Sequence, residues 1–60
     1  MTYPDAAIAA AVAQARDVYD QPALVVDMAA MILADRAEHV SAAAEVVVGW
    51  LAREHVEGGA

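Results

Sequence analysis

The chain has 60 residues, of which 62% are apolar, and a formal net charge of −6 at pH 7. It contains no cysteine and no lysine, and its only strongly basic side chains are three arginines. Binding to nucleic acid and to anionic membrane surfaces depends on cations that neutralise phosphates, so this balance argues against both. The absence of cysteine excludes a disulfide framework and a thiolate metal site.

Sixty residues correspond to one domain, residues 1–60, with a marginal core, because a chain of this size buries only ~60% of the surface that its unfolded form exposes. Such chains are commonly stabilised by close helix packing or by oligomerisation. The most apolar run, residues 23–34, contains Asp27 and is too short to span a membrane. The N-terminus lacks the basic residues of a secretion signal. We therefore expect a cytoplasmic protein.

The first expected helix covers about residues 3–19. Its apolar residues recur every three or four positions and form one stripe. The stripe comprises Ile8, Val12, Ala15 and Tyr19. This spacing predicts a short amphipathic helix.

A turn at Asp20-Gln21-Pro22 separates this helix from the rest of the chain, because proline disfavours a helical conformation of the residue before it. From Pro22 to about residue 56, apolar residues recur at alternating spacings of four and three, which is typical of a helix-packing seam. The seam comprises Val26, Ala30, Leu33, Ala37, Val40, Ala44, Val47 and Leu51. The sequence thus predicts an all-α antiparallel hairpin, with a short first helix over about 3–19 and a long second helix over about 22–56.

A break in the second helix is the alternative. Ser41 is a suitable N-cap, and a break near residues 38–41 would give a three-helix bundle with helices of similar length. The seven-residue repeat favours the continuous helix, because it passes through Val40 without a change of phase. Ser41 also lacks a Glu or Gln three residues later, where Ala44 stands, so the capping box is incomplete.

A second apolar set lies on another side of the predicted long helix. That helix would be ~50 Å long and the first helix ~25 Å, so one short helix does not cover two apolar faces. We expect a second copy to cover the remainder, which gives a helical-bundle oligomer. The residues assigned to this protein interface are Val25, Met28, Ile32, Val46 and Trp50. A narrow polar strip contains Asp27, Glu38 and Glu45, with Leu24 and Met31 lying within it.

One polar cluster resembles a metal site. Asp35, Glu38 and His39 are spaced so that their side chains meet on a helix. The repeated Glu-x-x-His motif of helical-bundle metal sites is missing, so we assign no metal. The sequence shows no nucleophile–base pair, glycine-rich phosphate loop or pair of catalytic carboxylates. We expect a protein that is not an enzyme and that uses no cofactor.

Two classes of function remain. The preferred one is a small acidic helical module that self-associates, as a dimer or higher oligomer, and presents an apolar helix face to another protein. The alternative is a regulatory binder, such as an antitoxin, an inhibitor or a phage-encoded accessory protein, that inserts an apolar helix face into its target. The first should be a stable oligomer alone, whereas the second should be poorly ordered or weakly associated until its partner is added.

Overall fold

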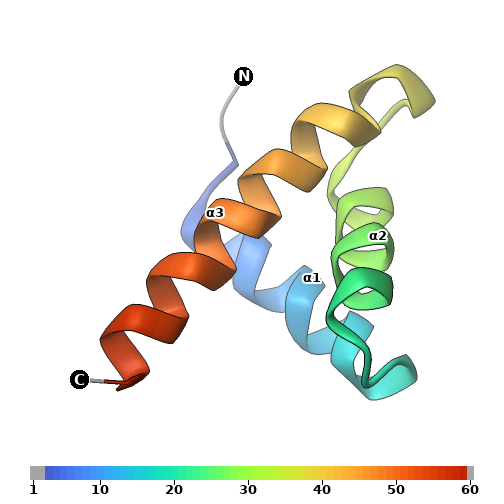
Figure 1. Ribbon diagram of the computed structural model, residues 1–60. Coiled ribbons are helices and arrows are strands. Elements are labelled where there is room, and N and C mark those ends of the chain that lie inside the picture. The colour runs from blue at the N-terminus through green and yellow to red at the C-terminus, as the bar shows by residue number, and fades with distance from the viewer. Residues whose placement is uncertain (1–2, 60) are drawn as a thin grey trace.

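The computed structural model describes residues 3–59, and the side chains of residues 3–56. Within these residues the chain forms three α-helices, which are α1 (Asp5–Val18), α2 (Pro22–Leu33) and α3 (Val40–Gly59). A short 3-10 helix, η1 (Ala37–His39), leads into α3 (Figure 1). The predicted all-α fold class is confirmed.

The first helix and the turn after it lie where the sequence places them. Ile8, Val12 and Ala15 are buried and form the expected stripe along α1. Tyr19 differs, because it follows the last helical residue in extended backbone (φ −125°, ψ 146°). Its side chain is 37% exposed and so contributes little to the core.

The predicted continuous helix over residues 22–56 is wrong. Its first part ends at Leu33, and the backbone is extended at Ala34 (φ −74°, ψ 130°) and at Arg36 (φ −142°, ψ 151°). Helical structure resumes with η1 and α3. The three-helix alternative therefore describes the chain, with a break over residues 34–39 that starts earlier than the expected 38–41.

The cause of the break is burial. In a continuous helix Val25 and Val47 would lie ~33 Å apart along the axis, whereas both belong to one buried cluster. Local chemistry helps, since Asp35 is a weak helix former. Its carboxylate also accepts a hydrogen bond from the His39 side chain across the break, at 2.9 Å. Folding α3 back onto α2 thus gives this small chain a core of its own.

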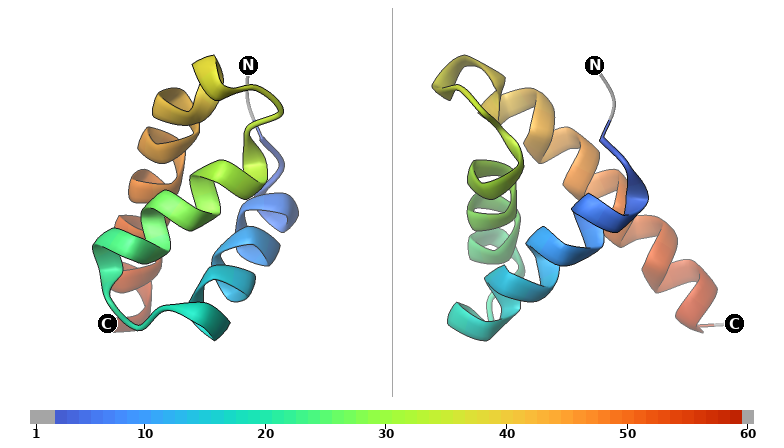
Figure 2. Two further views of the ribbon diagram at one scale, coloured as in Figure 1. Left: turned by 90° about the vertical axis from the view of Figure 1, so that its right-hand side faces the viewer. Right: turned by 180° about the vertical axis from the view of Figure 1, so that it is seen from behind.

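The helix α2 is central to the arrangement. It packs against both α1 and α3, whereas those two helices contact each other much less. In the left-hand view of Figure 2, α2 lies nearest the viewer, with α1 and α3 on either side behind it. The C-terminal end of α3 projects beyond the other two helices (Figures 1 and 2). No helix within residues 3–59 combines the length and the apolar character needed to cross a membrane.

The core is small and built largely from alanine. Its buried residues are Ile8, Ala11, Val12, Ala15, Val25, Ala29, Ala30, Ala43 and Val47. Alanine allows helix backbones to approach closely but contributes little burial energy. Among the larger apolar side chains of α2, Val25 is buried, whereas Leu24, Met31 and Ile32 are exposed.

Candidate functional site

The side of α2 that is turned away from α1 and α3 is apolar. Leu24, Met31 and Ile32 are 40%, 63% and 41% exposed, and Met28 between them is half-buried. Residues at these spacings follow one side of a helix. Asp27, the one charged residue of α2, lies among them. We call Leu24, Asp27, Met28, Met31 and Ile32 the α2 outer face.

The helix α2 is apolar nearly all round, with Asp27 as its one charged residue. Its inner side is supplied by Val25, Ala29 and Ala30, which are almost completely buried. A helix without a polar side is normally covered on every side. Here α1 and α3 cover only the inner side, and contiguous exposed apolar surface of this kind commonly marks an interaction site.

An open groove of about 360 Å³ lies between α1 and the C-terminal part of α2, next to the outer face. The residues that line it are Tyr3, Ala7, Ala10, Ala11, Gln14, Ile32 and Leu33. Alanines supply most of the α1 wall, so the groove has room for a bulky apolar side chain from another molecule. Ile32 belongs to both the groove and the outer face and makes them one continuous surface.

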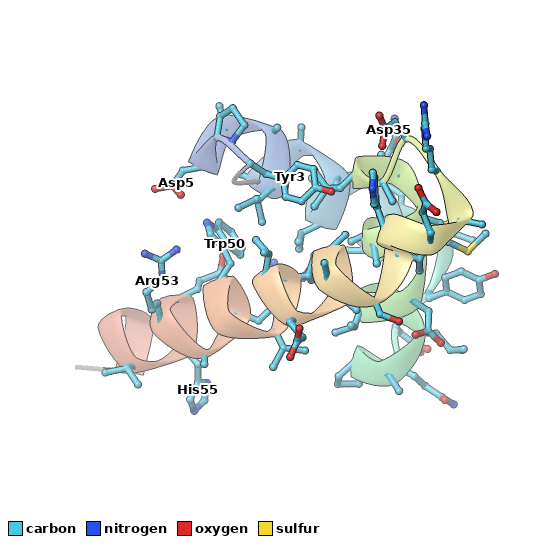
Figure 3. The ribbon with its side chains drawn as sticks, turned by 90° about the horizontal axis from the view of Figure 1, so that it is seen from above. Tyr3, Asp5, Asp35, Trp50, Arg53 and His55 are labelled. Atoms are coloured by element: carbon cyan, nitrogen blue, oxygen red, sulfur yellow. The ribbon has the colours of Figure 1, made fainter. Side chains whose placement is uncertain are left out.

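The five residues predicted to form a protein interface are divided between core and surface. Val25 is 4% exposed and lies in the core. Met28, Val46 and Trp50 are half-buried and pack against that core. Figure 3 shows Trp50 pointing from α3 toward the N-terminal end of α1. Among the five, only Ile32 is exposed. The sequence pattern put all five residues on one face of a single helix, whereas the break divides them between α2 and α3.

Leu24 and Met31 were not predicted from the sequence as interface residues. The sequence pattern placed them in the polar strip of a long helix, next to Asp27. That strip does not exist as one surface, because Glu38 and Glu45 lie beyond the break, in η1 and α3. Read alone, residues 22–33 contain one charged residue and no other polar side chain, and that signal would have identified an unusually apolar helix.

The predicted seam is mostly interior. Ala30 and Val47 are buried, and the half-buried members are Val26, Leu33, Val40, Ala44 and Leu51. Ala37 is exposed, because it lies in η1 outside both helices. The repeat therefore marks the inner sides of two successive helices.

The break carries a small polar cluster. His39 Nδ1 donates a hydrogen bond to Asp35 Oδ1 at 2.9 Å, and its Nε2 lies 3.7 Å from Glu38 Oε1. Arg36 Nη1 lies 3.7 Å from the same glutamate oxygen. The bond from His39 lowers the pKa of the Asp35 carboxyl. Among residues 3–59, no three His, Cys, Asp or Glu side chains are grouped so that they would hold a metal ion. The cluster lies on the connection between α2 and α3.

Each arginine is engaged in an ion pair. Arg16 Nη2 lies 3.1 Å from Glu54 Oε1, and Arg53 Nη2 lies 3.8 Å from Asp5 Oδ1. Figure 3 shows Arg53 on α3 pointing toward Asp5 at the start of α1. These two pairs join α1 to α3, and the third arginine is in the polar cluster of the break.

Several carboxylates are left without a cationic neighbour. Within the side chains that the structure describes, those with no ion pair are Asp17, Asp20, Asp27 and Glu45. Residues 17–35 contain four aspartates and no lysine, arginine or histidine. The segment that includes the α2 outer face is therefore acidic without internal compensation.

No protein-family model, curated protein or solved structure matches this chain.

Proposed function

We propose that the chain is a non-enzymatic interaction module, which self-associates and uses the α2 outer face to bind another protein. The observation that carries the proposal is the exposure of Leu24, Met31 and Ile32 along one side of a helix that already packs on its other side. Single exposed apolar residues are common on protein surfaces, but an aligned set beside a groove is typical of helix-mediated recognition.

The composition of the face suits an adaptable contact. Met28 and Met31 are unbranched and flexible, so they adjust to irregular apolar surfaces. Fully covering a side chain of the size of leucine or methionine stabilises a complex by ~1.5–3 kcal/mol relative to leaving it in water. Leu24 and Met31 are partly covered already, so each contributes less than that.

Self-association rests on a second apolar strip, on α3. Val48 and Val56 are 52% and 71% exposed, and their spacing of eight residues places them on neighbouring parts of one side of the helix. Ala52 lies between them, and a Cβ atom built at Gly49 would meet no heavy atom within 4 Å. Small residues here allow a second helix to approach closely. The long helix with two uncovered apolar faces, from which the sequence predicts oligomers, is divided into α2 and α3 in the structure.

Sedimentation equilibrium at micromolar concentration tests self-association. The wild-type chain should be a dimer or larger, and Val48→Lys should shift it to monomer. Val18→Lys is the matched control, because Val18 is similarly exposed, at 60%, but lies on α1. A wild-type monomer that is fully helical by circular dichroism would contradict self-association, and an oligomer that persists in Val48→Lys would contradict the α3 strip.

The regulatory-binder alternative differs in what it requires of the free chain. A binder of that kind would be poorly ordered or weakly associated until its target is added. The core is buried within a single chain, and four of its residues are 0% exposed, namely Ala15, Ala29, Ala43 and Val47. A core of this kind supports a module that is folded before it binds a partner. A cooperative thermal transition of the free protein is the expected result.

A further inference from the structure

The α2 outer face combines an apolar centre with uncompensated negative charge. We infer that its partner is a cationic amphipathic protein segment, in which apolar side chains are flanked by lysine or arginine. This inference rests on the proposed function of the face and specifies the chemistry of what it binds.

Asp27 supplies the negative charge within the α2 outer face. It lies three residues after Leu24 and four before Met31, so its carboxylate borders both exposed side chains. None of the three arginines pairs with it, because all of them are engaged with Glu54, Glu38 or Asp5. A partner that covers the face must therefore bring a cation to Asp27 or leave this carboxylate partly desolvated and unpaired.

The flanks of α2 carry the same sign of charge. Asp20 lies two residues before the helix and has no ion pair within the described side chains. Asp35 lies two residues after it and accepts a hydrogen bond from His39. A helical partner lying along α2 would thus meet carboxylates before, within and after the apolar stretch.

A second copy of the chain is a poor occupant of this face. The midpoint between Leu24 and Met31 falls between residues 27 and 28, so a two-fold antiparallel pairing centred there would bring the two copies of Asp27 close to the axis. Like charges juxtaposed across an interface oppose binding, which leaves self-association to the α3 strip.

The geometry also orients the partner. Asp27 and Ile32 are five residues apart and therefore lie ~140° apart around the helix. Ile32 borders the groove formed with Ala7 and Ala10 of α1. A partner segment would place a bulky apolar side chain in that groove and a cation on the opposite border, beside Asp27.

The test uses three synthetic 18-residue amphipathic peptides that share a leucine face and carry Lys, Gln or Glu on its flanks. Their binding to the intact chain is measured by isothermal titration calorimetry. At low ionic strength we expect the Lys peptide to bind ~10-fold more tightly than the Gln peptide and the Glu peptide to bind most weakly, with the differences reduced by added salt.

Two pairs of variants locate the binding site. Asp27→Asn should weaken the Lys peptide ~3-fold or more and leave the Gln peptide unchanged, whereas Glu45→Gln, the same charge change on α3, should alter either by less than ~2-fold. The double variant Leu24→Ala/Met31→Ala should weaken both peptides. Val18→Ala/Val56→Ala removes similarly exposed valines elsewhere and should weaken neither.

Equal binding of the Lys and Gln peptides would overturn the cationic-partner inference and leave the apolar docking surface standing. Equal effects of Asp27→Asn and Glu45→Gln on the Lys peptide would also overturn the cationic-partner inference. The peptide would then be attracted by the net charge of the chain and not by the carboxylate of Asp27. Binding that is insensitive to Leu24→Ala/Met31→Ala, or no binding of any peptide, would overturn both this inference and the proposed role of the α2 outer face.

Discussion

Arg16 on α1 and Glu54 on α3 form an ion pair with 3.1 Å between Nη2 and Oε1. The Arg53–Asp5 pair, at 3.8 Å, connects the same two helices. Since α1 and α3 share little other contact, these surface pairs are the main polar link between them. Both helices are otherwise held in place by α2.

The Arg16–Glu54 pair should add little stability. Its side chains are 51% and 43% exposed, and exposed ion pairs contribute only ~0.2–1 kcal/mol. Arg16→Gln should therefore lower the free energy of unfolding in urea by less than about 1 kcal/mol, and by still less at high salt. A loss of several kcal/mol would mean that α1 is held by its charges and not by α2.

The core makes a stronger prediction, for which the chain supplies a matched control. Val47 is 0% exposed and Val48 is 52% exposed, so one chemical change can be compared at adjacent positions of α3. Val47→Ala should destabilise the fold by ~1.5–3 kcal/mol through lost burial and a cavity. Val48→Ala should change stability by no more than ~0.5 kcal/mol. Urea denaturation of the two variants would contradict the packing of α3 if they were equally stable.

Proline at position 40 distinguishes the observed fold from the long helix. In a continuous helix Val40→Pro would remove an interior hydrogen bond, clash with the preceding turn and abolish folding. In the structure Val40 is the first residue of α3, and its φ of −61° suits proline. The substitution still removes the bond from the Val40 N–H to the Ala37 carbonyl and disfavours helical backbone at His39, so we expect a loss of ~1–2 kcal/mol.

The measurement is thermal unfolding followed by circular dichroism. Val40→Pro should keep a cooperative transition with a lower Tm, and Ala44→Pro, one turn further into α3, should lose it. A Val40→Pro variant with no transition would argue for helical continuity through residues 34–40.

Position 40 also shows what the sequence alone can determine. The apolar stripe of α1 and the turn at Pro22 follow from periodicity and from proline geometry, and the structure has both. The break at 34–39 contains no glycine or proline, and its local signals, Asp35 and the candidate N-cap Ser41, are weaker than the apolar repeat. The seven-residue repeat continues through Val40 because its residues before the break form the inner side of α2 and those after it form the inner side of α3.

The exposed face was harder to identify for a related reason. Which side of an apolar helix remains bare depends on where its neighbours lie, and that is a tertiary property. Met31 and Val25 are both apolar residues of α2, yet one is 63% exposed and the other 4%. The difference in exposure between these two residues arises from where α1 and α3 pack against α2.

The hydrogen bond between His39 and Asp35 predicts a response to pH. Because the bond lowers the pKa of Asp35 below 3.8 in the folded chain, the associated stabilisation is present above the pKa of the unfolded chain. It is lost as pH falls through the lowered folded value. A carboxyl titration by NMR should show the pKa of Asp35 rising toward its ordinary value in His39→Gln. An unchanged pKa in that variant would contradict the bond.

We propose above that the α2 outer face, with its groove, is the binding surface of this chain. The most direct test of this proposal is a titration of the ¹⁵N-labelled protein with the Lys-flanked amphipathic peptide, followed by amide chemical shifts. We expect the largest shifts in the α2 outer face, at Leu24, Asp27, Met28, Met31 and Ile32, and at the α1 groove residues Ala7 and Ala10. Little change is expected at Val48, Ala52 and Val56. Shifts concentrated on α3, or spread evenly over the acidic residues of the whole chain, would contradict the proposal.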